Sequence, residues 1–222
     1  MEQIRRSRFL MIVLISVLSA FLFPGTVTPQ ICKDWIAKIV SIQGSVLVQR
    51  AGKTQKTPIK LNDTYSLGDV IFVGNRSRAA VVLCNEAVLR LDQNTTLTFS
   101  GIEKERTTLL EMIKGAIHFF SRTPRSLKVA TPFVNGTVEG TEFLVMVEPD
   151  QTFISIFEGR VRAENELGSL LLASGQTAIT RKGKAPQARV VVRPRDAVQW
   201  SLFYPPILDY RSTDFPGSSE WE

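Results

Sequence analysis

Histidine and cysteine are nearly absent from this chain. One histidine, His118, and two cysteines, Cys32 and Cys84, occur among 222 residues. Together they are too few to build, unaided, the four-ligand sites that hold structural zinc. His118 alternates with the apolar Ile117 and Phe119, which predicts that its side chain faces solvent or a polar rim and takes no part in catalysis. We therefore expect no metal, no cofactor and no enzymatic activity.

A dense charged face is also missing. The net charge is +6, but the basic residues are spread along the chain, with denser groups only near the start and at residues 181–195. Proteins that bind nucleic acid usually gather such residues on one face, often with aromatic side chains between them. The pattern argues against a nucleic-acid partner and indicates an ordinary solvated surface.

The apolar run near the start of the chain is too short for a typical membrane span. Residues 9–23 carry no charge, follow Arg5, Arg6 and Arg8, and end at Pro24-Gly25. A spanning helix usually needs about 20 apolar residues, whereas a basic start and a shorter apolar helix are typical of an export signal. We expect residues 1–31 to be a signal peptide, with an uncleaved inner-membrane anchor as the alternative. The protein would then lie in the periplasm or cell envelope, and only this segment would contact a membrane.

Export bears on the two cysteines, because disulfides persist outside the cytoplasm. A bridge between Cys32 and Cys84 is compatible with that location. Cys84 also follows the apolar run at residues 79–83, where a small buried residue would fit equally well. Both interpretations stay open.

Helical periodicity is missing between Ala37 and Thr180. Short runs rich in Val, Ile, Thr and Phe follow one another there, with turn residues between them, which is typical of strands. Two alternating runs, Glu142 to Glu148 and Thr152 to Phe157, meet at Pro149-Asp150 and predict a hairpin. The region is predicted to be all-β: an antiparallel sandwich, a jelly roll or an irregular β-solenoid of many short strands.

Three glycines punctuate these runs in a similar way. Gly44, Gly115 and Gly159 each stand shortly before an apolar position of the next run. Glycine adopts positive φ or a bulge at little cost. We expect each of them to redirect the chain into the following strand.

The pattern changes after Thr180. Residues 181–195 are predicted to form a basic linker with a last extended run at 189–192. Asp196 could cap a short helix that Pro205-Pro206 would end, followed by a polar tail to Glu222.

The stretch from Val129 to Val161 resembles the signature of the FecR-type extracytoplasmic domain, with its Thr-Pro, Gly-Thr-Glu-Phe and Glu-Gly elements. The resemblance covers about Gly68 to Gln176 and includes a Gly-Asp element and a Ser-Arg-Ala element. We expect mainly structural roles for the motif residues, which are Gly68, Asp69, Arg78, Thr131, Pro132, Gly140, Thr141, Glu142, Phe143, Glu158 and Gly159. Thr141 would hydrogen-bond its own turn, Glu142 would accept from neighbouring amides, and Phe143 would fill the core. Glu139 stands where the family usually carries arginine, which changes the charges that this turn can pair with.

The resemblance implies an exported binding or sensing module, by likeness to a membrane protein that passes an iron-siderophore signal from a receptor to a sigma factor. Only residues 1–8 precede the apolar run, so we expect no cytoplasmic sigma-regulating domain. Two alternatives of other classes stay open, an enzyme acting on envelope polymers and a structural scaffold subunit.

The segment Pro194 to Pro206 resembles the junction at which FecR-type domains lead into tetratricopeptide helical repeats. It leaves Trp200, Phe203 and Tyr204 as an apolar group that we expect to be exposed and to bind a partner. The expected partner is an envelope protein, such as a tetratricopeptide protein or a receptor, or a cell-wall or surface glycan.

Overall fold

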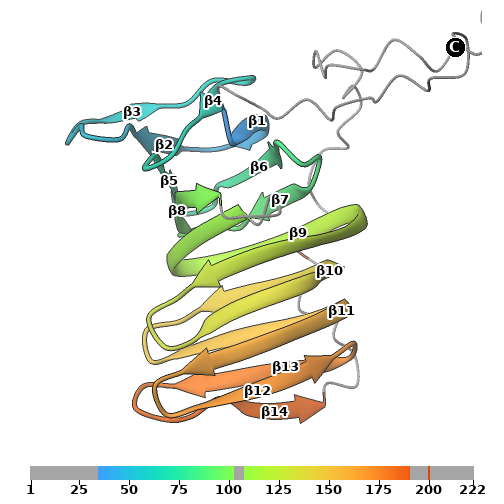
Figure 1. Cartoon of the computed structure of the whole chain (residues 1–222). Helices are drawn as coiled ribbons and strands as arrows, with labels where there is room; N and C mark the ends of the chain where they lie inside the picture. The colour runs from blue at the N-terminus through green and yellow to red at the C-terminus, as the bar shows by residue number, and fades with distance from the viewer. Residues whose placement is uncertain (1–34, 103–107, 191–199, 201–222) are drawn as a thin grey trace, which may run out of the picture. The chain divides into compact units, whose positions relative to one another are not determined.

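The computed structural model describes residues 35–102, residues 108–190 and Trp200 (Figure 1). The expected signal segment and the expected helix around Trp200 lie outside these ranges, apart from Trp200 itself. Within the described ranges, no helix is long and apolar enough to cross a bilayer.

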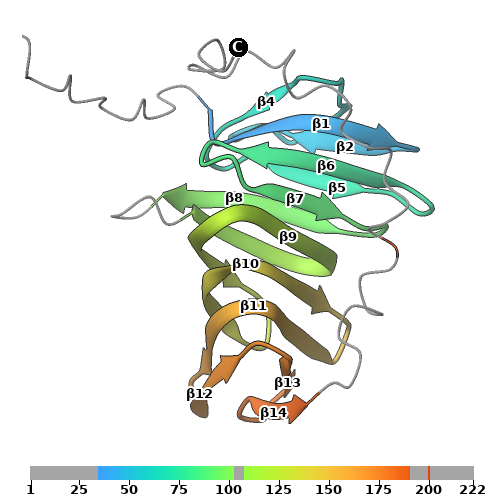
Figure 2. The same cartoon turned by 90° about the vertical axis from the view of Figure 1, so that its right-hand side faces the viewer.

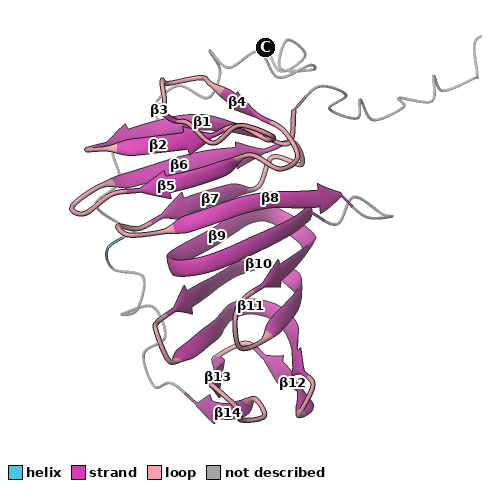
Figure 3. Ribbon diagram, turned by 90° about the vertical axis from the view of Figure 1, so that its left-hand side faces the viewer, coloured by secondary structure: helices cyan, strands magenta, loops and turns pink. Residues whose placement is uncertain are grey.

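Strands and short turns make up nearly all of the described chain (Figure 3), as the missing helical period predicts. Every strand pair is antiparallel. The all-β prediction is confirmed. The strands are β1 (Ala37–Gln43), β2 (Val46–Gln49), β3 (Lys56–Pro58), β4 (Thr64–Tyr65), β5 (Val70–Val73), β6 (Arg78–Leu83), β7 (Val88–Leu91), β8 (Thr96–Ile102), β9 (Thr108–Ala130), β10 (Asn135–Val147), β11 (Gln151–Asn165), β12 (Gly168–Ala173), β13 (Gln176–Arg181) and β14 (Gln187–Val190).

Two long strands, β9 and β11, change partners along their length, and β10 pairs with both of them throughout. The start of β9 pairs with β8, its middle pairs with β7 and the end of β10, and its last part pairs with the start of β10. In the same way β11 pairs first with β13 and then with β12. Figure 2 shows β9, β10 and β11 as curved ribbons. One continuous sheet therefore folds over, and its two layers enclose a common core.

Glycines lie where the long strands bend. Gly115 in β9 has φ +96° and Gly159 in β11 has φ +117°, while Gly44 has φ +75° between β1 and β2. The positive φ expected at these three glycines is confirmed, and Gly44 leads the chain from β1 into β2 as expected. Gly115 and Gly159 lie inside β9 and β11, so the expectation that they lead into a following strand is wrong. L-residues with a Cβ are strained at such angles, so glycine is favoured there.

The predicted hairpin joins β10 to β11. Val147 pairs with Thr152, and the Glu148 amide donates to the Gln151 carbonyl at 2.9 Å across Pro149-Asp150. Further along the chain, residues 182–186 form the turn from β13 to β14, and β14 pairs with β13. The extended run expected near residue 189 is thus the last described strand of the sheet.

Large side chains fill the core between the layers. The rings of Phe119 and Phe143 stack with centroids 4.6 Å apart, and those of Tyr65 and Phe99 lie 6.0 Å apart. All four are fully buried. Burying one side chain of this size stabilises a fold by about 1.5–3 kcal/mol, so the expected role of Phe143 in filling the core is confirmed.

Candidate functional site

Gly68 and Asp69 form a clamp at the start of β5. The Asp69 carboxylate accepts hydrogen bonds from Arg50 Nη1 at 2.8 Å, from the Ala51 amide at 2.9 Å and from the Ser66 amide at 3.0 Å. Gly68 has φ +82°, which lets the chain turn tightly into this position. The carboxylate is buried and accepts on both oxygens, so it ties residues 50–51 to the turn that begins at Ser66.

Tyr65 lies beside this clamp. The Arg50 guanidinium lies 4.9 Å from the centre of the Tyr65 ring, within the range of a cation–π contact. The Tyr65 hydroxyl is buried and has no hydrogen-bond partner among the described residues. Burial raises the pKa of Tyr65, the carboxylates of Asp63 and Asp69 raise it further, and Arg50 opposes them.

Two other motif positions fasten neighbouring elements. Arg78 Nε donates to the Asp92 carboxylate at 3.2 Å, which joins β6 to the residue after β7. Thr131 Oγ1 donates to the Val134 carbonyl at 2.5 Å and lies 3.2 Å from Thr152 Oγ1. The first contact holds a strand pair, and the second holds the turn in which Pro132 follows Thr131. Both are folding devices.

Gly140 and Gly159 face each other where β10 and β11 bend together. They are directly paired, and the register shifts immediately afterwards. A Cβ on Gly140 would lie 2.4 Å from the Glu158 carbonyl oxygen, and one on Gly159 would lie 2.4 Å from the Gly140 Cα. The backbones approach so closely that neither position has room for a side chain.

The charges beside this glycine pair are on the surface. Glu139 is exposed and pairs in register with Arg160 on β11, so opposite charges face each other across the strands. Glu158 is also exposed, and its register partner is Glu142. The acidic residue at position 139 is therefore matched locally by an arginine on the neighbouring strand.

Thr141 does not form the hydrogen bond expected of it, and Glu142 contacts a residue of another strand. Thr141 Oγ1 is buried and has no hydrogen-bond partner among the described residues, so the expected bond to its own turn is wrong. Glu142 reaches another strand, where its Oε1 lies 3.1 Å from His118 Nε2. The register shift after Gly140 turns these side chains away from their own turn.

The prediction that His118 faces solvent or a polar rim is wrong. Its side chain is 3% exposed and meets the Phe157 ring edge-on, with centroids 6.1 Å apart. Strand alternation correctly predicts that His118 and Phe119 point to opposite sides. It does not predict that the side carrying His118 is covered as well.

Trp200 contributes to this cover. It packs against a second apolar cluster, formed by buried Ala116 and Leu144 with Met146 and Phe157. The expectation that Trp200 is exposed is therefore wrong, because apolar side chains of the domain already contact its indole. Phe203 and Tyr204 lie outside the described residues.

The FecR protein family model matches residues 69–162. This stretch of the chain is similar to a FecR domain. Of the motif residues, only Gly68 falls just outside this range, while the sheet itself continues through β14. No curated protein matches the chain.

Solved structures resemble the FecR domain and the strands around it. Two crystal structures of a candidate anti-sigma factor from Parabacteroides distasonis are 18% identical, with TM-scores of 0.52. The alignments cover 60% of this chain and 63% and 64% of the other chains. This chain thus spans less than two thirds of their length, and the likeness shows the fold alone.

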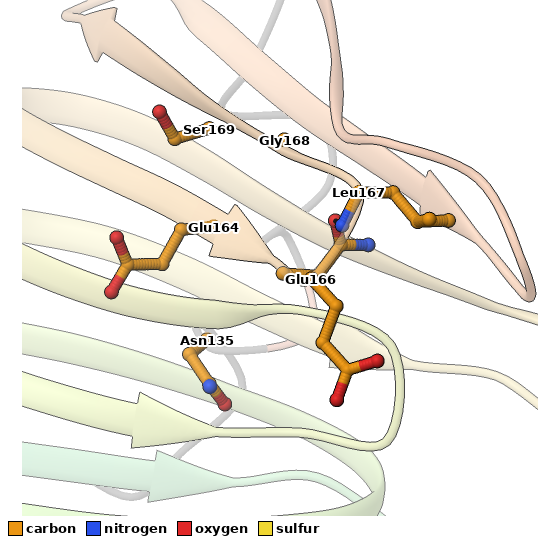
Figure 4. Close-up of a pocket in the computed structure, with 7 residues that line it drawn as sticks. Asn135, Glu164, Glu166, Leu167, Gly168 and Ser169 are labelled. Carbon is orange, nitrogen blue, oxygen red and sulfur yellow. Dashed lines mark hydrogen bonds between the residues drawn. The ribbon is translucent and has the colours of Figure 1, made fainter.

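An open pocket of about 560 Å³ lies beside the end of the FecR domain (Figure 4). Its walls come from the start of β10 and the turn between β11 and β12. Asn165 braces this turn, because its Nδ2 donates to the Lys184 carbonyl at 2.8 Å and to the Phe133 carbonyl at 3.1 Å. The sequence pattern does not predict this pocket; its signal there is the polar turn before Gly168. The lining residues are Asn135, Glu164, Asn165, Glu166, Leu167, Gly168 and Ser169.

Metal-binding side chains do not gather in the part of the chain that the structure describes. No group of three or more His, Cys, Asp or Glu is placed to hold an ion there. Cys84 is disulfide-bonded, and the only other cysteine of the chain, Cys32, lies outside the described residues.

Proposed function

We propose that this chain is an exported FecR-type binding and sensing module of the bacterial cell envelope that engages a protein partner. The FecR domain supports a role in signal transduction, and the structural neighbours described as anti-sigma factors fit that role. Two polar motif residues stabilise the fold: Asp69 joins residues 50–51 to its own turn, and Thr131 fixes another turn. This supports binding over catalysis.

The observation that carries the proposal is the open edge of β14. This strand pairs with β13 on one side, and no described strand pairs with its other side. All its residues are exposed, and Val190 is 71% exposed. Leu167 and Leu171, in and beside β12 at the same end of the sheet, are also exposed. An unpaired edge with apolar side chains favours the addition of an extended segment from another protein.

Site-specific photo-crosslinking in living cells tests this proposal. A crosslinking residue at Val190 should capture a discrete protein in the envelope fraction, whereas the same residue at Leu61 should not. Leu61 is a matched control because it is an exposed leucine, at 57%, next to β4 and far from β14 in the strand order.

Leu171→Lys should then weaken capture at Val190 without lowering the amount of protein, because a charged side chain beside an edge discourages strand addition. Equal capture at both positions would refute the edge as the binding surface. Recovery of the chain in the cytoplasm alone would refute the envelope role.

A further inference from the structure

One layer of the sheet is buried on both faces. In a sheet with one solvated face, every second side chain along a strand is exposed. Here residues 79–83 of β6, 116–119 of β9, 143–145 of β10 and 154–156 of β11 are buried without a break. The core covers one face only, so something else covers the other.

The strand register places the outward residues in one line. His118 pairs with Arg90 on one side and with Leu144 on the other. On one flank Arg90 pairs with Ala80, which pairs with Ser41. On the other flank Leu144 pairs with Ser155, which pairs with Thr177. We call this line the outer row; it consists of Ser41, Ala80, Arg90, His118, Leu144, Ser155 and Thr177.

The outer row belongs to a different surface from the core. None of its members is part of the main core cluster, and Leu144 belongs to the second cluster with Ala116. All of them are buried except Arg90, which is half-buried; Leu144 is 2% exposed. Four members are Ala, Ser or Thr, and Ser155 Oγ lies 2.8 Å from Thr177 Oγ1. Adjacent strands lie about 4.8 Å apart, so seven strands give a row of roughly 29 Å, long enough for an extended segment.

The chain itself leads into this row. Arg189 on β14 pairs with Thr177, so the last described strand ends in line with the row. Ten residues after Val190, Trp200 packs on Ala116 and Leu144. The path from β14 to β10 and β9 crosses three or four strand spacings, about 14–19 Å. Ten residues can span at most about 35 Å, so the connection reaches easily.

We infer that the outer row is a binding groove for the chain's own C-terminal segment, residues 191–204, with Trp200 as its anchor. The segment is rich in apolar residues, with Val191, Val192, Val198, Leu202 and Phe203 around the tryptophan. Trp200 thus has a partner within the chain, and a foreign protein would reach this face only by displacing the segment. This inference does not depend on the edge of β14 being a binding site.

Crosslinking from position 200 tests the inference in the full-length protein. A photo-crosslinking phenylalanine in place of Trp200 should form crosslinks to β9, β10 or β11, identified by mass spectrometry. Mixing isotopically light and heavy copies separates crosslinks within one chain from crosslinks between copies. Crosslinks within one chain would support the inference. Crosslinks between copies, to another protein, or to none of these strands would overturn it.

Thiol accessibility gives a second, independent measurement. Ser155→Cys lies in the outer row, whereas Ser169→Cys lies on exposed β12 and is the control. We expect the first thiol to react with a maleimide at least about tenfold more slowly than the second, because local opening must precede its reaction. Trp200→Ala should remove most of this difference, while Trp221→Ala should leave it unchanged. Equal reactivity at both positions in the parent protein, or protection that survives Trp200→Ala in a folded chain, would overturn the inference.

Discussion

The close contact between Gly140 and Gly159 gives the sharpest test of how this sheet folds over. An alanine Cβ at position 140 would lie 2.4 Å from the Glu158 carbonyl oxygen and 3.1 Å from the Gly159 Cα. Both are backbone atoms of the paired strand, so no rotamer change relieves the contact. Gly136 on the same strand is a matched control, because its alanine Cβ would contact only side chains, with the end of Ile154 nearest at 2.9 Å. Neither glycine has a positive φ.

The expected costs of the two substitutions differ clearly. Overpacking of a rigid core costs about 1–3 kcal/mol and sometimes more, and we expect Gly140→Ala to cost about 3 kcal/mol because two backbones must separate. Gly136→Ala should change stability by no more than about 1 kcal/mol. Alanine loses less conformational entropy than glycine when a strand forms, and this gain offsets the cost of moving the end of the Ile154 side chain. A difference of about 2 kcal/mol corresponds to roughly a 30-fold change in the unfolding equilibrium.

Urea denaturation followed by far-ultraviolet circular dichroism measures both free energies of unfolding. Similar m-values for the two variants would show that the same surface unfolds in each. If the two free energies agree within about 0.5 kcal/mol, the proposed steric role of the glycine pair is wrong. Failure of Gly140→Ala alone to fold would agree with the prediction, whereas failure of both variants would refute the distinction between backbone and side-chain contacts.

Three further predictions concern other parts of the domain. Asp69→Ala should cost about 2–4 kcal/mol in urea denaturation, because three donors lose a charged acceptor; an equal cost for Asp150→Ala in an exposed turn would contradict the clamp. Tyr65 should stay protonated near pH 10 in the folded chain, and stability should fall as the pH rises above that ordinary value, because its pKa is raised by burial. A spectroscopic titration in which Tyr65→Phe removes a transition near pH 10 would oppose this. Phe143→Ala should cost about 3–5 kcal/mol, whereas Phe120→Ala, at a position 42% exposed, should cost less than about 1 kcal/mol; comparable losses would show that the ring stack with Phe119 adds little.

Local patterns in the sequence predict much of this fold. The hairpin at Pro149-Asp150 follows from two alternating runs and a turn pair, and the bends at Gly115 and Gly159 follow from glycine before apolar residues. These features depend on residues close together in the chain, so the sequence carries them directly. The role of Phe143 in the core follows from the same alternation.

The contacts of the candidate site residues around His118 are harder to predict, because they join residues that are distant in the sequence. His118 and Glu142 are 24 positions apart, and they meet only because β9 pairs with β10 across a register shift. The same register shift explains why Thr141 does not form the hydrogen bond predicted within its own turn. Alternation assigns each side chain to a face of the sheet, but it cannot say what else lies on that face.

The sequence by itself determined the strands, their turns and the FecR motif, because strand propensity, turn chemistry and glycine act over a few neighbouring residues. Only the tertiary structure decided that Asp69 is a clamp, that Gly140 must face another backbone, and that His118 is buried. The reason is physical: the environment of a side chain is set by register and by segments far away in the chain. Trp200 shows the difference most clearly, since an apolar residue that appeared free in the sequence packs on the sheet of its own domain.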